Sequence, residues 1–299
     1  MNPVLQAHAL GKRYGQRQAL ADCTLEVPPG RVVGLVGPNG AGKTTLLKIA
    51  CGMLAPTTGR IEVLGEQPAA GPAQLARVGY VAQDTPTYAS LSVADHLKLG
   101  AKLNPRWDAK LAQARIDQLG LEPKQKAGKL SGGQRAQLAL TVAVAKRPGL
   151  LILDEPVASL DPLARRDFLR HLMESVAEND TSVILSSHLV SDLERVCDYL
   201  IVLVASRVQL AGETEDLLAE HYRIVCSRRQ DTDLPPELDV IWSEHTGRQS
   251  TFIVRSQTGL PAGGWPAEHL DLEDLVLTYM ERSAGRGRRT ATRTTGDAR

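Results

Sequence analysis

A run of nine residues between a predicted strand and a predicted helix constrains the fold of this chain more than any other feature. It fits the pattern G-x-x-x-x-G-K-[ST], which binds phosphate where a buried strand precedes it and a helix follows. Residues 32–36 supply the apolar run before it, and residues 46–51 predict a short helix that Gly52 can end. The nine residues are Gly37, Pro38, Asn39, Gly40, Ala41, Gly42, Lys43, Thr44 and Thr45. This order predicts an α/β fold with a phosphate-binding loop.

The residue types in this loop suit a nucleoside triphosphate. Glycines let consecutive backbone NH groups converge on phosphate oxygens, and the positive end of the following helix faces the same charge. In such a loop Lys43 reaches the β and γ phosphates, the Thr44 hydroxyl ligates Mg²⁺, and Thr45 adds a bond to the α phosphate. The alternative is a glycine-rich turn that fits the pattern by chance, and the flanking strand and helix argue against it.

Polar residues also follow three other predicted strands. They are Gln83 after residues 78–82, Asp154 and Glu155 after the apolar run 150–153, and His188 after residues 181–187. Ligands bind at the carboxyl edge of a parallel sheet, so all four are candidates for one site. Gln83 is either an ordinary strand end or a ligand of metal and water. His188 is either a surface or core histidine or a site residue.

The N-terminal part predicts an antiparallel layer made of strands at residues 4–9 and 21–27, with a turn at residues 11–15 between them. Tyr14 lies in that turn, upstream of the phosphate loop. Its ring is either half buried or free to stack on adenine, and the later motifs favour stacking.

A helical insert occupies residues 84–147, with Ser92 and Asp108 as predicted N-caps. It ends in a second candidate anion site, where a hydroxyl and backbone NH groups lie at the start of a helix over residues 135–140. The residues are Ser131, Gly132, Gly133 and Gln134, preceded by Leu130.

The run L-S-G-G-Q at residues 130–134 resembles the signature of the ATP-binding cassette (ABC) ATPases, and the loop 37–45 strengthens that resemblance. It implies a P-loop NTPase with an ABC-type core, which has a mixed central sheet, an N-terminal antiparallel layer and a helical subdomain. It also implies ATP and Mg²⁺ as ligands. In this family the signature of one subunit covers the γ phosphate held by another, which implies an ATP-dependent head-to-tail dimer.

The resemblance also implies roles for single residues. Tyr14 would stack on adenine, and four residues between 83 and 188 would act on Mg²⁺, the attacking water and the γ phosphate. Thr44 and Gln83 would hold Mg²⁺, and Asp154 would hold it through water. Glu155 would act as the general base, and His188 would contact the γ phosphate and the water. Residues 158–161 resemble the loop through which the two subunits sense each other.

The rest of the chain predicts a closing segment and a small appendage. We expect a helix at 189–196, strands at 199–204 and 207–210, and a helix at 213–221. Strands at 222–226 and 250–256 and an amphipathic helix at 271–282 follow. This pattern divides the chain into an ATPase domain (1–220), an α+β appendage (221–282) and a disordered basic tail (283–299).

Composition narrows the setting. The net charge of +1 gives no overall attraction to nucleic acid or an anionic membrane. The four cysteines lack C-x-x-C spacing, which suits free thiols in a reducing cytosol. No apolar run approaches the about 18 residues that span a bilayer, so a membrane role needs a partner chain.

Two function classes remain in competition. A soluble ABC ATPase acting on DNA or ribosomes would carry a long coiled coil or a second cassette, and this chain has neither. We therefore expect a transporter subunit on the cytoplasmic face of the membrane, bound to separate transmembrane permease subunits and to no specific nucleic acid. Residues 161–166, 187–189 and 272–277 resemble ATPase subunits of bacterial drug and antibiotic exporters, with an importer as the alternative.

Overall fold

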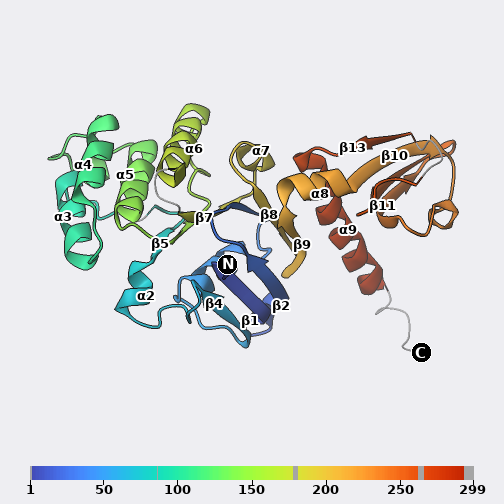
Figure 1. The fold of residues 1–299 in the computed structure, drawn as a ribbon, viewed down its shortest axis with the longest axis horizontal. Coiled ribbons are helices and arrows are strands. Elements are labelled where there is room, and N and C mark those ends of the chain that lie inside the picture. Colours follow the sequence, from blue (N-terminus) through green and yellow to red (C-terminus); the bar gives the residue numbers. More distant parts are fainter. Residues whose placement is uncertain (1, 86, 178–180, 262–265, 293–299) are drawn as a thin grey trace.

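The computed structural model describes residues 2–85, 87–177, 181–261 and 266–292. It has three sheets of six, three and four strands. Figure 1 shows the helices α3, α4 and α5 at one end of the molecule and the strands β10, β11 and β13 at the opposite end.

The six-stranded sheet lies in the middle and has the order β5-β6-β7-β3-β8-β9. Its strands are β3 (Val32–Val36), β5 (Val78–Val81), β6 (Leu150–Asp154), β7 (Ser182–Ser187), β8 (Tyr199–Val204) and β9 (Arg207–Glu213). The pairs from β5 through β8 are parallel, and only β9 runs antiparallel, against β8. Every residue of β3, β6 and β7 is buried, as continuous apolar runs predict for strands covered on both faces.

The N-terminal strands form an antiparallel sheet in the order β2-β1-β4, made of β1 (Leu5–Tyr14), β2 (Arg17–Val27) and β4 (Thr58–Val63). Its apolar face packs with the helix α1 (Lys43–Ala50) against the central sheet. The predicted turn at residues 11–15 is wrong for residues 11–14, because β1 continues to Tyr14 and the turn lies at residues 15 and 16. Gly11 pairs with Thr58 there, and a Cβ at Gly11 would lie 2.3 Å from the Thr58 hydroxyl oxygen.

The helical insert contains α3 (Val93–Leu103), α4 (Ala109–Gln118) and α5 (Gly132–Ala145), which pack around a small apolar cluster of their own. The predicted caps are confirmed: Ser92 accepts from the Asp95 NH and Asp108 accepts from the Leu111 NH. The short α2 (Pro72–Ala76) precedes β5, and α6 (Pro162–Ala177) follows the Asp154-Glu155 pair.

The C-terminal part consists of a four-stranded antiparallel sheet and a long helix. The sheet has the order β11-β12-β10-β13. After α7 (Val190–Leu193) and α8 (Thr214–Glu220), its elements are β10 (His221–Ser227), β11 (Asp239–His245), β12 (Gln249–Arg255), β13 (Ala267–His269) and α9 (Leu272–Thr292). Leu275, Val276 and Tyr279 of α9 belong to the apolar cluster that also contains β7 and β8 residues, so α9 packs on the ATPase core.

Two C-terminal expectations differ from the structure. The helix predicted at residues 189–196 covers only Val190–Leu193, because Val196 and Cys197 both donate to the Leu193 carbonyl and the chain turns there into β8. The predicted disorder from residue 283 is wrong up to Thr292, where α9 ends. The first half of α9 is packed, which removes the cost of nucleation, and three arginines favour helix in a stretch where Gly285 and Gly287 oppose it. Residues 293–299 lie outside the described residues.

Candidate active site

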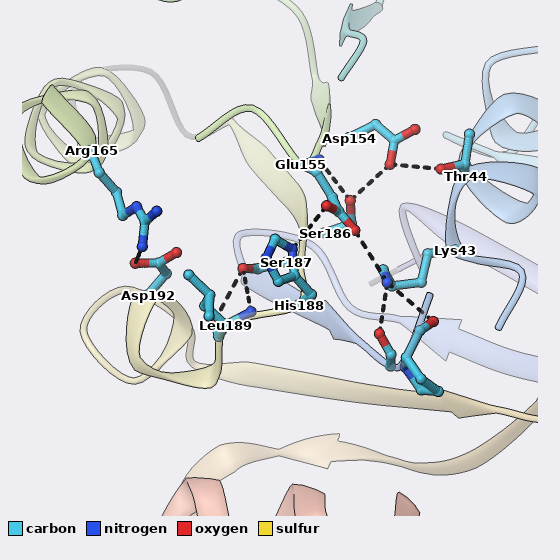
Figure 2. Close-up of polar contacts among 12 residues, drawn as sticks. Lys43, Thr44, Asp154, Glu155, Arg165, Ser186, Ser187, His188, Leu189 and Asp192 are labelled. Carbon is cyan, nitrogen blue, oxygen red and sulfur yellow. Dashed lines mark hydrogen bonds and ion pairs between the residues drawn. The ribbon is translucent and has the colours of Figure 1, made fainter. Parts of the chain in front are cut away.

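Three loops meet at the carboxyl edge of the central sheet. The glycine loop follows β3, Glu155 follows β6, and His188 follows β7. Since β7 pairs with both β6 and β3, the three loops are neighbours in space (Figure 2). The predicted convergence of Lys43, Thr44, Asp154, Glu155 and His188 is therefore what the structure shows.

The glycine loop needs glycine at Gly40 and Gly42, whose φ angles are +81° and +112°. A Cβ at Gly42 would lie 2.3 Å from the Ala19 carbonyl oxygen. The loop therefore packs directly on β2, and no larger residue fits at this point. Helix α1 begins at Lys43 with no acidic residue in its first turn, so its positive end is open to an anion.

Lys43 is the cation of this loop, and its side chain is only 5% exposed. Its Nζ donates to the Gly37 carbonyl at 2.7 Å and lies 3.2 Å from Glu155 Oε1. A buried ammonium is stable only with such partners. The contacts hold Lys43 over the loop, where phosphate oxygens would replace them.

Thr44 and Asp154 lie together beside the loop. The Thr44 hydroxyl donates to Asp154 Oδ1 at 3.2 Å, and the Ser186 hydroxyl donates to the same oxygen at 2.9 Å. Ser186 also accepts the Glu155 backbone NH at 2.8 Å. Sequence reasoning missed Ser186 as a site residue, although the pairing of adjacent strand ends sets Asp154 opposite Ser186.

Glu155 lies between two other side chains. Its Oε1 faces Lys43, while its Oε2 lies 3.0 Å from His188 Nδ1. The Glu155 backbone has a φ of +46°, a conformation that costs a non-glycine residue energy and that clusters at functional sites. The Ser186 bond to its NH holds it there. His188 is far more exposed than Glu155, so its ring lies at the open side of the pair.

A cavity of about 410 Å³ lies over the glycine loop. Tyr14 and Gln83 line this cavity together with the glycine loop, as predicted. Arg17 and Ala19 also line it, and sequence reasoning missed both. Tyr14 is 47% exposed. The remaining lining residues are Asn39, Gly40, Ala41, Gly42, Lys43, Thr44, Thr45 and Glu155.

The signature residues lie elsewhere. The Ser131 hydroxyl accepts a hydrogen bond from the Gln134 NH, and the Gln134 side chain accepts one from the Ser131 NH. The two bonds form a capping box at the start of α5. Ser131, Gly133 and Gln134 line a separate cavity of about 490 Å³, next to α6. Within one chain the structure does not bring the signature to the glycine loop.

The donors at the glycine loop fit a magnesium nucleotide. Among the described residues no group of three or more His, Cys, Asp or Glu side chains forms a cage for a metal. One hydroxyl and one carboxylate, as at Thr44 and Asp154, are the ligands that Mg²⁺ uses when phosphates and water complete its shell. Burial and the Asp154 charge raise the pKa of Cys51 to about 12, so this nearby thiol stays neutral.

A parallel sheet with a glycine loop, a buried lysine and two adjacent carboxylates at one edge defines a P-loop nucleoside triphosphatase. Residues 20–158 match the family model described as "ABC transporter". The chain is 34% identical over 301 residues to the Nod factor export ATP-binding protein I of Cupriavidus metallidurans, covering 94% of this chain and 99% of that protein. The chain therefore belongs to the ATP-binding subunits of ABC transporters, a family that hydrolyses ATP to drive transport.

Two other matches cover less of the chain. The Fe(3+) ions import ATP-binding protein FbpC of Pseudomonas fluorescens is 34% identical over 72% of this chain and 62% of its own length. A solved "ATP binding subunit of ABC transporter" superposes with a TM-score of 0.64 at 28% identity, over 72% of this chain and 91% of that one. The predicted family, ABC-type fold and ATPase activity are thus confirmed. In the part of the chain that the structure describes, no helix is long and apolar enough to cross a bilayer.

Proposed function

We propose that this chain is the ATPase subunit of an exporter, and that ATP joins two copies of it beneath separate transmembrane chains. The observation that carries the chemistry is the position of Glu155 between Lys43 and His188. A carboxylate next to a phosphate-binding cation is well placed to accept a proton from a water that attacks the terminal phosphate.

Each side chain of the cluster then has one role. Lys43 binds the β and γ phosphates. When its ammonium contacts the phosphates, it leaves Glu155 Oε1, and that oxygen can then act as the general base. His188 orients the water and the terminal phosphate. Thr44, Asp154 and Gln83 hold Mg²⁺, which neutralises charge on the phosphates when bound. Ser186 fixes Asp154 and the Glu155 backbone at once.

Tyr14 is proposed to stack on adenine. Its ring lines the same cavity as the glycine loop, and half of its surface is open. The Lys12 ammonium lies 5.4 Å from the ring centroid, so a cation already borders one face of the tyrosine.

The dimer is inferred from the separation of two half-sites. Lys43 and Ser131 line different cavities, so the signature of one chain has no phosphate in its own chain to bind. Head-to-tail pairing would bring the residues from Ser131 to Gln134 of one copy over the γ phosphate held by the other. Driving such a clamp from mostly open to mostly closed takes about 5.5 kcal/mol of differential binding. Two γ phosphates with several charge-assisted bonds of about 1.5 to 3 kcal/mol each suffice.

Export is favoured by the resemblance of residues 161–166, 187–189 and 272–277 to exporter subunits. The Nod factor export protein of Cupriavidus metallidurans matches 94% of this chain, and the iron importer matches 72%. We assign the ATPase to residues 1–220, with the helical subdomain at about 84–147, and treat 221–282 as an appended unit. Binding to permease subunits would hold the chain on the cytoplasmic face of the membrane.

The first test separates binding from hydrolysis. Glu155→Gln should keep ATP affinity and lose turnover by about 10²- to 10⁴-fold, because it removes the general base. Lys43→Ala should instead weaken ATP binding. Isothermal titration and phosphate release measure the two effects. Near-normal turnover in Glu155→Gln, or unchanged affinity in Lys43→Ala, contradicts these assignments.

The second test addresses the dimer. The Glu155→Gln chain should run as a dimer with ATP and as a monomer with ADP on a sizing column. Adding Ser131→Arg to that variant should abolish the ATP-dependent dimer, since a bulky cation would block the γ phosphate contact. The same mass with both nucleotides argues against the clamp.

The third test addresses direction. A strain that lacks this gene should become sensitive to at least one compound of an antibiotic panel, and the wild-type gene but not the Glu155→Gln gene should restore resistance. A growth defect confined to limiting iron or sulfate would support an importer instead.

A further inference from the structure

Arg165 and Asp192 form an ion pair between two segments of the site. Arg165 lies in the first turn of α6, just after the loop 155–161, and Asp192 lies in α7, four residues after His188. Arg165 Nη1 and Asp192 Oδ1 are 3.7 Å apart, and the side chains are 23% and 8% exposed. Figure 2 shows the pair beside the segment that carries His188.

Arg165 is attached to the loop that begins at Glu155. Its Nη2 donates to the Leu160 carbonyl at 3.5 Å, and its backbone NH donates to the Asp161 carbonyl at 2.9 Å. Leu160 is buried in the main apolar cluster. A shift of this loop therefore moves the Arg165 guanidinium as well.

Asp192 is attached to the His188 segment. The Ser187 hydroxyl accepts the Leu189 NH at 3.0 Å and so sets the bend that leads from His188 into α7. Burial raises the pKa of Asp192, while Arg165 and His188 both act to lower it. The Asp192 carboxylate thus lies within the electrostatic reach of the His188 ring.

The pair has hydrogen-bonding capacity that it does not use. Arg165 Nε and Asp192 Oδ2 are both buried, and neither has a hydrogen-bond partner among the described residues. A small approach of α6 to α7 would shorten the 3.7 Å contact, so the pair can take up a shift between the two segments without breaking.

We propose that Arg165 and Asp192 are positioning residues for hydrolysis, which couple the loop 155–161 to His188. The proposal rests on the roles proposed above for Glu155 and His188. Residues 158–161 form the stretch expected to meet the second subunit, so a contact made there reaches His188 through Arg165 and Asp192. Neither residue lines the cavity over the glycine loop.

The test measures kcat and KM for ATP hydrolysis by the full chain. Arg165→Gln and Asp192→Asn should each lower kcat about 10- to 100-fold and leave KM within about twofold, since a displacement near 1 Å at a catalytic group has this cost. Asp192→Glu keeps the charge and should recover most of the turnover. The double variant should lose no more than the worse single variant, because both changes break one contact.

Exposed neighbours provide matched controls. Arg166→Gln and Glu194→Gln remove the same charges from the same two segments and should keep wild-type kcat. Folded Arg165→Gln and Asp192→Asn variants with unchanged kcat, or losses that simply add in the double variant, overturn the coupling. If Glu155→Gln retains turnover, the proposed base fails instead. If Glu155→Gln is inactive while the pair variants are normal, only the coupling fails.

Discussion

Ser186 is the position where one hydroxyl supports both acidic residues of the site, and Ser186→Ala tests that support. The side chain is fully buried at the end of β7. It donates to Asp154 Oδ1 at 2.9 Å and accepts the Glu155 NH at 2.8 Å. Alanine removes both bonds with little change in shape, and water has no ready access to replace them.

The magnitude follows from the two bonds. A hydrogen bond to a carboxylate contributes about 1.5 to 3 kcal/mol and a neutral one about 0.5 to 1.5 kcal/mol. Ser186→Ala should therefore lower the free energy of unfolding by about 2 to 4.5 kcal/mol. It should also lower kcat more than KM, because Glu155 loses the bond that holds its unfavourable backbone conformation. Urea unfolding and steady-state ATP hydrolysis measure the two effects.

Ser182→Ala is the matched control. Ser182 is also a buried serine of β7, but it lies at the amino end of the strand and accepts the Gly30 NH at 2.9 Å. Its loss should cost about 0.5 to 1.5 kcal/mol of stability and leave kcat unchanged. Equal effects of Ser186→Ala and Ser182→Ala on kcat would refute the idea that Ser186 orients the carboxylates.

Three further predictions concern the nucleotide, the loop and the C-terminal part. Tyr14→Ala should weaken ATP binding by about 1 to 3 kcal/mol while Tyr14→Trp is tolerated, and equal losses in titration would favour a structural tyrosine. Gly42→Ala should abolish ATP binding in a fluorescent-nucleotide assay, because its Cβ would meet the Ala19 carbonyl at 2.3 Å; normal binding would contradict the cradle. His221 is buried and bonded to the Tyr279 hydroxyl at 3.0 Å, and burial lowers its pKa below the ordinary 6.5. The unfolded chain therefore binds a proton there that the folded chain does not, so stability should fall as pH drops below about 6.5. The loss should be smaller in His221→Gln, and equal pH profiles of the melting temperature would contradict this.

Much of the site follows from local sequence order. A strand, a glycine loop and a helix in succession leave one arrangement for Gly37 to Thr45, and the apolar run before Asp154 places its carboxylate at a sheet edge. The helix caps were also predictable from local sequence, since the Ser92 and Asp108 side chains accept hydrogen bonds from backbone NH groups three residues further on. These features depend on residues close in the chain, so their sequence signals are strong.

Contacts between distant segments were harder to predict. Ser186 meets Asp154 only because β6 and β7 are neighbours in that register. Gly11 meets Thr58 only because β1 and β4 are neighbours in their sheet. Neither pairing has a local pattern, because the partner strand lies tens of residues away.

The amino-acid sequence by itself determined the family, the ATPase chemistry and the glycine loop that holds phosphate, since each depends on residue types at fixed short spacings. Only the tertiary structure decided how the C-terminal unit attaches, with α9 sharing an apolar cluster with β7 and β8. It also decided that Arg165 meets Asp192, 27 positions further along the chain. Such contacts form when helices pack to bury apolar area, and that packing depends on the shape of the whole core rather than on any single stretch.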